Sequence, residues 1–383
     1  MLYRALLWFS MFLIACSTAF AETGRRPISL DELLAGTALG LGPDPPAIPS
    51  NEDVMALSDE MREFLDTHIG MRAGDQIKLR QLFNAIFNRE TFGLGYDETT
   101  STAAGTFAAK HGNCLSFTFM FVVLARGVGL RASFQEVDIP PEWTFNENTY
   151  ILNRHINIHV DFRVGTIPAK IVDFYIADFK ADYDMDIVSD QRALAHFFNN
   201  LGAQFMQQGE TTAAFYAFRK AIAENDASFA PAWVSLGTLY SRMGLDDYAE
   251  SAFLQALEID PSDLTAMNNL TALYDRRGEP ELAESYRNKV RTHRRRNPYY
   301  RFQLARMAYH VEDYDLAIGH LKYAMRKNRD DDRFCALLGL VYFEMGEEQK
   351  SRRWMARAEK NAKRDSMKRI YSSKIDRLMA ASR

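Results

Sequence analysis

The second half of this 383-residue chain repeats itself, and the period of the repeat limits the folds open to it. A leucine followed by a small residue or threonine recurs at spacings of 35, 34, 34 and 34 residues, at Leu201-Gly202, Leu236-Gly237, Leu270-Thr271, Leu304-Ala305 and Leu338-Gly339. Such a period is typical of stacked helical hairpins. Because each hairpin buries its apolar face against its neighbours, the pattern predicts an all-α solenoid.

This pattern resembles the tetratricopeptide repeat. The second copy has the fullest signature, with Trp233-x2-Leu236-Gly237-x2-Tyr240 followed by Ala249, Phe253, Ala256 and Pro261. We expect five repeats over residues 191–365 and a solubilising capping helix over residues 366–383. The resemblance implies that the array binds a protein or peptide partner.

A second feature lies upstream, where Gly112-Asn113-Cys114 precedes an almost wholly apolar stretch. The stretch predicts a buried helix from Cys114 to Ala125, closed by the glycines that follow. A thiol at a helix N-terminus has its pKa lowered by the helix dipole, and the free N–H groups there can stabilise an oxyanion. Cys114 is therefore a candidate nucleophile.

Residues rich in β-branched and aromatic side chains follow this helix. Segments 131–139, 150–162 and 169–176 predict strands of an antiparallel sheet. His155 and His159 lie on one face of the second strand, about 13 Å apart, so only one of them can serve as base for Cys114. Asp173 on the next strand is a candidate orienter of the imidazole. The strand register leaves the choice of histidine open.

Over residues 50 to 180 these motifs resemble the transglutaminase-like superfamily of papain-like cysteine enzymes. The resemblance implies an α+β domain over residues 51–190 with Cys114 as nucleophile, His155 as base and Asp173 as orienter. Two departures stand out. Asn157 occupies the place where the family commonly has an aromatic residue, and residues 140–149 form a long insertion that suits a substrate-covering loop.

Two functions follow from this organisation. The first is a cysteine-dependent hydrolase or acyltransferase that acts on amide bonds, with water or an amine as acceptor. The alternative is a catalytically silent scaffold whose repeats bind partners. No cofactor or metal is expected, although His155, His159 and Asp161 could in principle hold zinc. Cys114 already accounts for His155 without a metal.

The first 21 residues have the layout of an export signal, with a basic residue followed by a short apolar stretch. Leu13-Ile14-Ala15-Cys16 resembles a lipobox that would lipidate Cys16, and an ordinary cleavage site before Glu22 is the alternative. The signal predicts a periplasmic protein, either soluble or an outer-membrane lipoprotein. Residues 22–50, rich in glycine and proline, are expected to form a tether with one short helix at residues 30–35.

The charge and cysteine content narrow the choice of partners. A net charge of −4 and a pI near 6.1 give no reason to expect nucleic acid. The basic run at residues 291–296 is expected to be a solvated helix end, with contact to an anionic membrane surface as the alternative. A disulfide between Cys114 and Cys335 is not expected, because it would tie the head to a distant repeat.

Overall fold

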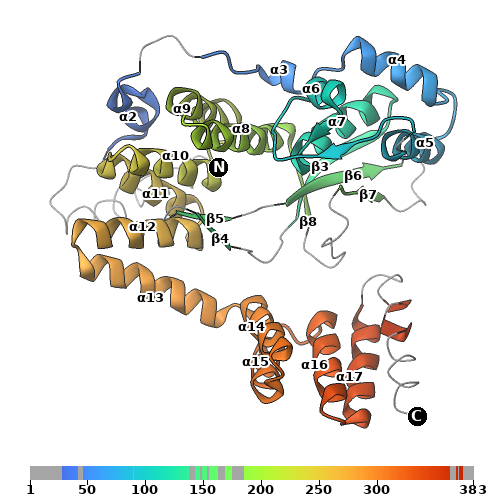
Figure 1. The fold of residues 1–383 in the computed structure, drawn as a ribbon, viewed down its shortest axis with the longest axis vertical. Helices are drawn as coiled ribbons and strands as arrows, with labels where there is room; N and C mark the ends of the chain where they lie inside the picture. Colours follow the sequence, from blue (N-terminus) through green and yellow to red (C-terminus); the bar gives the residue numbers. More distant parts are fainter. Residues whose placement is uncertain are drawn as a thin grey trace, which may run out of the picture. The chain divides into compact units, whose positions relative to one another are not determined.

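The computed structural model describes residues 28–41, 46–88, 90–137, 143–146, 149–152, 155–162, 169–174, 185–362, 368–369 and 371–373 (Figure 1). These residues form two compact units, one ending at Tyr286 and the other beginning at Arg287. The predicted export segment and most of the predicted capping helix lie outside the described residues. Among the described helices, none is both long enough and apolar enough to cross a bilayer.

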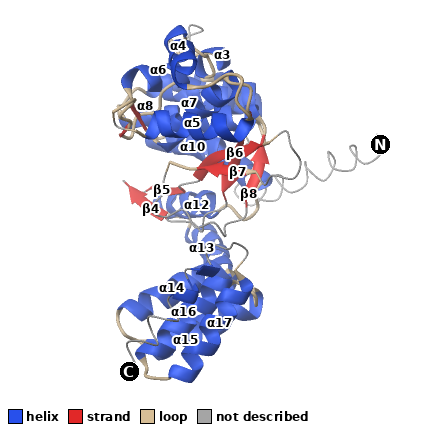
Figure 2. Cartoon of the chain, turned by 90° about the vertical axis from the view of Figure 1, so that its right-hand side faces the viewer, coloured by secondary structure: helices blue, strands red, loops and turns tan. Residues whose placement is uncertain are grey.

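The N-terminal part of the first unit, before the repeats, is an α+β head. Its helices are α2 (Leu30–Ala35), η1 (Thr37–Leu39), α3 (Asn51–Val54), α4 (Asp59–His68), α5 (Asp75–Phe87), α6 (Ala103–Ala109) and α7 (Cys114–Gly127). Its four-stranded sheet has the order β7-β6-β3-β8 and consists of β3 (Arg131–Val137), β6 (His155–Asp161), β7 (Lys170–Val172) and β8 (Met185–Val188). Figure 2 shows these strands in red beside the helices.

All the strand pairs in this sheet are antiparallel, as the sequence predicted for β3, β6 and β7. Strand β8 was not predicted. It lies at the sheet edge and has no buried side chain, with Ile187 55% exposed, so its sequence lacks the alternation that marks a strand. Two short pairings also occur, of β1 (Gly95–Tyr96) with β2 (His111–Gly112) and of β4 (Trp143–Asn146) with β5 (Thr149–Leu152).

Two short elements were not predicted. Helix α6 lies in the polar segment between residues 88 and 110, and Thr102 caps its first turn by accepting from the N–H of Gly105. The insertion at residues 140–149 contains strand β4 and the start of β5, which form a hairpin. Both elements are short, and α6 is built mainly from small residues, so neither gives a long periodic signal.

Helix α7 is the core of the head. Its residues 115–125 are all buried, as predicted. The ring of Phe119 lies 4.7 Å from that of Phe134 on β3 and 5.4 Å from that of Phe197 in the first repeat. Phe134 is paired with Ile158 on β6, so both side chains point to the face of the sheet that α7 covers. The helix therefore joins the sheet to the repeats.

Five helical hairpins follow between residues 190 and 361. They are α8 (Asp190–Gln207) with α9 (Thr211–Lys220), α10 (Ala230–Arg242) with α11 (Asp246–Ile259), α12 (Leu264–Arg277) with α13 (Pro280–Arg296), α14 (Pro298–His310) with α15 (Tyr314–Lys327), and α16 (Asp332–Glu344) with α17 (Glu348–Asn361). A π-helical turn, η2 (Ala221–Asn225), extends α9. The boundary between the compact units falls inside α13.

Glycines in the first helices of the hairpins allow close packing. A Cβ at Gly237 would lie 2.6 Å from Cε1 of Phe253, and a Cβ at Gly202 would lie 2.5 Å from Cε1 of Phe218. Real Cβ atoms do not approach so closely. The recurring leucine-glycine pairs of the sequence thus have a steric cause, because the aromatic ring of the second helix fills the space that a side chain would need.

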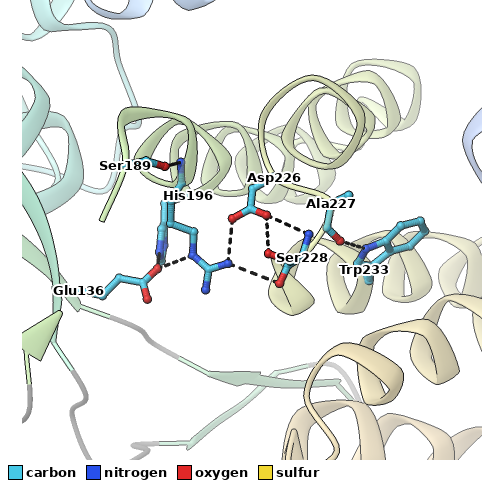
Figure 3. A network of polar contacts seen from close by, with 8 residues as sticks. Glu136, Ser189, His196, Asp226, Ala227, Ser228 and Trp233 are labelled. Atoms are coloured by element: carbon cyan, nitrogen blue, oxygen red, sulfur yellow. Dashed lines mark hydrogen bonds and ion pairs between the residues drawn. The ribbon is translucent and has the colours of Figure 1, made fainter. Parts of the chain in front are cut away.

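A polar network connects the sheet to the first hairpin (Figure 3). Glu136 Oε1 on β3 accepts from Arg192 Nε and lies 2.6 Å from His196 Nε2, both on α8. Arg192 also donates to Asp226, which precedes α10. The Arg126 guanidinium of α7 makes two hydrogen bonds, of 2.7 and 2.8 Å, to Asp190 at the start of α8. These contacts explain why head and first repeats form one unit.

Helix α2 of the N-terminal segment contacts the repeats. Helix α2 has the predicted bounds, and Leu33 within it is only 1% exposed. Tyr240 of α10 donates a 2.5 Å hydrogen bond to the Leu33 carbonyl. Gly36, with φ of +75°, ends the helix close to the ring of Phe215. Part of the segment that was expected to be a tether therefore packs against the first two hairpins.

Candidate functional site

Cys114 is the first residue of α7, as the sequence predicted, and it is half-buried. The preceding loop fixes the helix start. Asn113 is the N-cap, accepting from the N–H of Ser116 at 2.9 Å and donating to Thr100 Oγ1 at 2.9 Å. Ser116 Oγ accepts from the N–H of Ser101. The Gly-Asn-Cys motif thus clamps a loop onto the helix N-terminus and holds the thiol in one place.

The surroundings of this thiol raise its pKa instead of lowering it. Burial raises the pKa of Cys114, the nearby Asp173 carboxylate raises it further, and a backbone hydrogen bond offsets only part of this, giving about 11. The expectation of a lowered pKa was therefore wrong, because desolvation and a like charge outweigh the helix terminus. On the order of one thiol in 10⁴ is ionised at pH 7. A nucleophilic role requires a base.

Asp173 directly follows β7. Its Oδ2 accepts a 3.1 Å hydrogen bond from Asn157 Nδ2 on β6. The next residue, Phe174, has its ring 5.4 Å from that of Phe117 on α7 and 5.2 Å from that of Phe87 on α5. These ring contacts hold the end of β7 against the first turns of α7, which explains why the carboxylate influences the thiol.

The strand register settles the position of Asp173 relative to the two histidines. Ile158 on β6 pairs with Val172 on β7, so Asp173 continues opposite Asn157. Asn157 is two residues from His155 and two from His159. The register therefore puts Asp173 midway between the two histidines along β6.

Helix α7 approaches β6 at the end that begins with His155. Thr118, one turn after Cys114, lies with Oγ1 3.4 Å from the carbonyl of Ile156. The backbone of His155 pairs with Val137 on β3, and its side chain lies outside the described part of the chain. His159 is farther along the strand, with Nδ1 4.0 Å from Asp161 Oδ2.

Two buried amides lie side by side on the sheet face that carries Asp173. Gln135 on β3 pairs with Asn157 on β6, and they are 5% and 1% exposed. Gln135 Oε1, Asn157 Oδ1 and His159 Nδ1 have no hydrogen-bond partner in the described part of the structure. Asn157 was noted only as a departure from the family pattern, so its contact with Asp173 was missed. Among the described residues, no group of three or more His, Cys, Asp or Glu suits a metal ion.

The second unit offers a different kind of surface. Helix α14 and its C-cap residue expose Tyr300, Met307 and Val311, with Met307 66% and Val311 74% exposed. Their spacing of seven and four residues puts them along one side of the helix. Leu316, at the start of α15, is 49% exposed. We call Tyr300, Met307, Val311 and Leu316 the apolar stripe.

Comparison with known proteins supports the assignment of the hairpins as tetratricopeptide repeats. The Tetratricopeptide repeat family model matches residues 230–263, the α10–α11 hairpin and the turn after it. Anaphase-promoting complex subunit 3 of Schizosaccharomyces pombe is 26% identical over 129 residues, which are 34% of this chain and 19% of that protein. Uncharacterized protein ycf37 of Pyropia yezoensis is 34% identical over 71 residues, 18% of this chain and 40% of that protein. The chain thus spans less than half of either relative.

Solved structures include the MamA protein, 16% identical with a TM-score of 0.25 over 44% of this chain and 91% of that one. Another is YrrB, a TPR protein, 18% identical with a TM-score of 0.25 over 45% of this chain and 89% of that one. The class that the hairpins and the family match define is a repeat protein. More particularly, the chain contains a tetratricopeptide-repeat domain, joined here to an α+β head.

Proposed function

We propose that this protein is a scaffold whose tetratricopeptide repeats hold a protein or peptide partner. The observation that carries the proposal is the family match at residues 230–263, in an array of five hairpins. Stacked hairpins present an extended surface made for binding another chain. Binding requires no reactive group, so the proposal does not depend on the ionisation of Cys114.

The apolar stripe is the part of the array that we propose touches the partner. Met307 and Val311 expose most of their apolar surface, although the rest of α14 is packed into its hairpin through buried residues such as Phe302 and Ala305. Exposed apolar side chains that align on one helix mark interaction sites more often than scattered ones do.

A capture experiment tests this proposal. The full chain is immobilised, captured polypeptides are identified by mass spectrometry, and binding of the recovered partner is then measured with purified proteins. Met307→Ser combined with Val311→Ser should weaken binding about tenfold or more, because two apolar contacts are removed. Met345→Ser, at another exposed apolar position of the same unit, is the control and should bind normally. Equal binding by all three proteins would contradict the proposal.

We propose, as a second function, cysteine-dependent chemistry on amide bonds by a transglutaminase-like head. His155 would take the proton of Cys114, and the thiolate would attack a carboxamide carbon. The C–N bond would break as the amine leaves with that proton, and water or a second amine would release the acyl group from the thioester. The observation in favour is that the Asp173 carboxylate acts on a thiol at a helix start.

Two features bear on which residue would act as the base in this second proposal. The raised pKa of Cys114 leaves the thiol protonated at neutral pH, so His155 must act as base. Helix α7 contacts β6 beside Ile156, which favours His155 over His159. The test is intact-mass analysis after incubation with glutamine-containing peptides, with and without a primary amine. An acyl adduct or product that Cys114→Ser abolishes supports it. If neither an adduct nor a product forms, the enzymatic function is refuted and the scaffold function remains.

A further inference from the structure

The charge of this protein is divided unevenly along the chain. Residues 287–383 contain 25 Lys and Arg against 12 Asp and Glu, a formal charge of +13, and the total of −4 leaves −17 for residues 1–286. The small net charge of the whole chain is therefore the sum of an acidic first part and a strongly basic second unit. Such a unit attracts anionic partners over a range of about 10 Å at 0.1 M salt.

The basic residues gather around α14 and α15. Residues 285–311 contain eight Lys and Arg and no Asp or Glu, so α14 has no acidic residue at all. The stretch 316–329, which makes up most of α15, contains four more cations and no acid. No carboxylate within these helical stretches is available to neutralise the cations.

Two guanidiniums lie over one aromatic ring, and a histidine contacts one of them. The Arg301 guanidinium of α14 lies 4.6 Å from the ring centre of Tyr323 on α15, and that of Arg326 lies 5.0 Å from it. Arg301 Nη1 is 3.3 Å from His320 Nδ1. Because a guanidinium only donates, His320 must be neutral and accept at Nδ1, with its proton on Nε2. Burial and Arg301 both lower the pKa of His320, which agrees with the neutral form.

Several other arginines that the structure describes in the repeats are paired with carboxylates. Arg192, Arg277 and Arg333 each form ion pairs with carboxylates, at Glu136, Asp247 and Asp331 respectively. Neither Arg301 nor Arg326 forms an ion pair within the described residues, and neither does His320. Two like-charged guanidiniums held on one ring, with no counter-charge, are arranged to receive an anion.

We propose that Arg301, His320 and Arg326 form a binding site for the carboxylates of an acidic polypeptide segment in the partner protein. The site rests on the proposed scaffold function and specifies the chemistry of its ligand. Each guanidinium can take a carboxylate through two parallel hydrogen bonds, and His320 supplies a third donor through Nε2.

Two arguments favour a polypeptide over an anionic membrane. Arg301 and His320 are half-buried beside Tyr323, where a slender side chain reaches them more easily than a flat bilayer does. The apolar stripe begins at Tyr300, directly before Arg301, so one helix offers both apolar and cationic contacts. A polypeptide with mixed side chains fits this combination.

A second copy of the chain is a less suitable occupant, although residues 1–286 are acidic. Docking of one copy's first unit on the next copy's second unit would join unlike surfaces. Such a heterologous contact leaves a free surface at each end and propagates into open chains unless it closes into a ring. We therefore assign the site to a different protein.

The test uses the full chain and a fluorescent 12-residue peptide of alternating Glu and Ser, with a peptide of alternating Gln and Ser as its neutral match. Fluorescence anisotropy should show the Glu peptide binding about tenfold more tightly, and more weakly at about 200 mM than at about 50 mM salt. Arg301→Gln combined with Arg326→Gln should lose about tenfold in affinity. Arg352→Gln combined with Arg353→Gln removes the same charge from exposed positions on α17 and should bind as the wild type does.

Several results would overturn the site. One is equal binding of the two peptides. Another is an unchanged affinity of the Arg301/Arg326 variant for the Glu peptide, or an equal loss of affinity in the Arg352/Arg353 variant, when circular dichroism shows that the variants are folded. Binding to vesicles with anionic lipid but not to the Glu peptide would replace the partner with a membrane. Self-association that only the Arg301/Arg326 variant loses would replace it with a second copy. If binding of the captured partner depends on Met307 and Val311 but not on Arg301 and Arg326, the proposed scaffold function is supported and the carboxylate-binding site is refuted.

Discussion

Asn157 Nδ2 donates a 3.1 Å hydrogen bond to Asp173 Oδ2, so an amide holds the carboxylate that the sequence assigned to orienting a histidine. That carboxylate also raises the pKa of Cys114. A half-buried thiol and a carboxylate held near it form an arrangement that favours a protonated cysteine. The head is thus built around Cys114 in a form that is unreactive without a base.

Replacing Asp173 by Asn tests this electrostatic relationship. Removing the negative charge should lower the pKa of Cys114 from about 11 and speed its alkylation at a fixed pH near 8. The measurement is the rate of iodoacetamide labelling as a function of pH, followed by mass spectrometry of the Cys114 peptide.

Cys335 provides the internal control. It is fully buried in the second unit, and burial raises its pKa to about 11 without any contribution from Asp173. Its labelling rate should stay the same in the Asp173→Asn variant. Slower labelling of Cys114 in that variant would mean that Asp173 activates the thiol through His155, as a catalytic triad requires, and would refute the repulsive effect.

Glu136 should contribute to stability in a pH-dependent way. Burial raises the pKa of Glu136, but hydrogen bonds and charge from His196 and Arg192 outweigh this and bring it down to about 2, from 4.5. Its contribution is therefore fully present above about pH 5 and is lost as the pH falls toward 2. Glu136→Gln should lower the free energy of unfolding by about 2 kcal/mol at pH 7 and by much less at pH 3.

Urea unfolding of the first unit, followed by circular dichroism at several pH values, measures this difference. Glu224→Gln is the matched control, since the Glu224 side chain is 59% exposed and its one ion pair within the described residues is with Lys220, four residues away. It should change stability by less than about 0.5 kcal/mol. A Glu136 effect that is the same at pH 3 and pH 7 would show that the ion network is not its source.

Gly237→Ala should destabilise the second hairpin. The new Cβ would lie 2.6 Å from Phe253, a buried ring that cannot move freely, and such overpacking costs about 1 to 3 kcal/mol. Gly319→Ala on α15 is the control, because nothing lies within 4 Å of its Cβ position and alanine favours a helix. Thermal unfolding should show a lower Tm for the first variant only. A higher Tm for Gly237→Ala would contradict the packing account.

The N-terminal signal remains a prediction, since residues 1–21 lie outside the described structure. Expression in a Gram-negative bacterium should give a mature protein that begins either at an acylated Cys16 or at Glu22. Mass spectrometry of the N-terminal peptide distinguishes the two. A mature chain that retains Met1 would refute both export routes.

The sequence was most informative where a pattern is long. Five copies of a 34-residue period predicted the hairpins, and at Gly202 and Gly237 the recurring glycine has a steric cause, because an aromatic ring of the second helix approaches the backbone there. The helix starting at Cys114 was equally clear from its almost wholly apolar sequence, and its residues 115–125 are all buried. Segments 131–139, 150–162 and 169–176 predicted strands of an antiparallel sheet, and β3, β6 and β7 pair in that way.

The details of the candidate site could not be predicted, because they depend on contacts between distant segments. The register that places Asp173 opposite Asn157 is accompanied by the packing of Phe174 on α7, a contact between segments far apart in the sequence. The sign of the shift in the pKa of Cys114 depends on burial and on that register. Within the described residues Arg301 has no acidic partner and instead contacts His320 and Tyr323 of α15, which a count of charges does not show.

The most direct test of the scaffold is hydrogen–deuterium exchange of the full chain with and without its captured polypeptide partner. The account predicts slower exchange in α14, residues 298–310, and in adjoining α15 when the partner is bound. Protection confined to the head, around residues 95–174, with none in α14 or α15, would contradict it and would point to the cysteine site as the place of recognition.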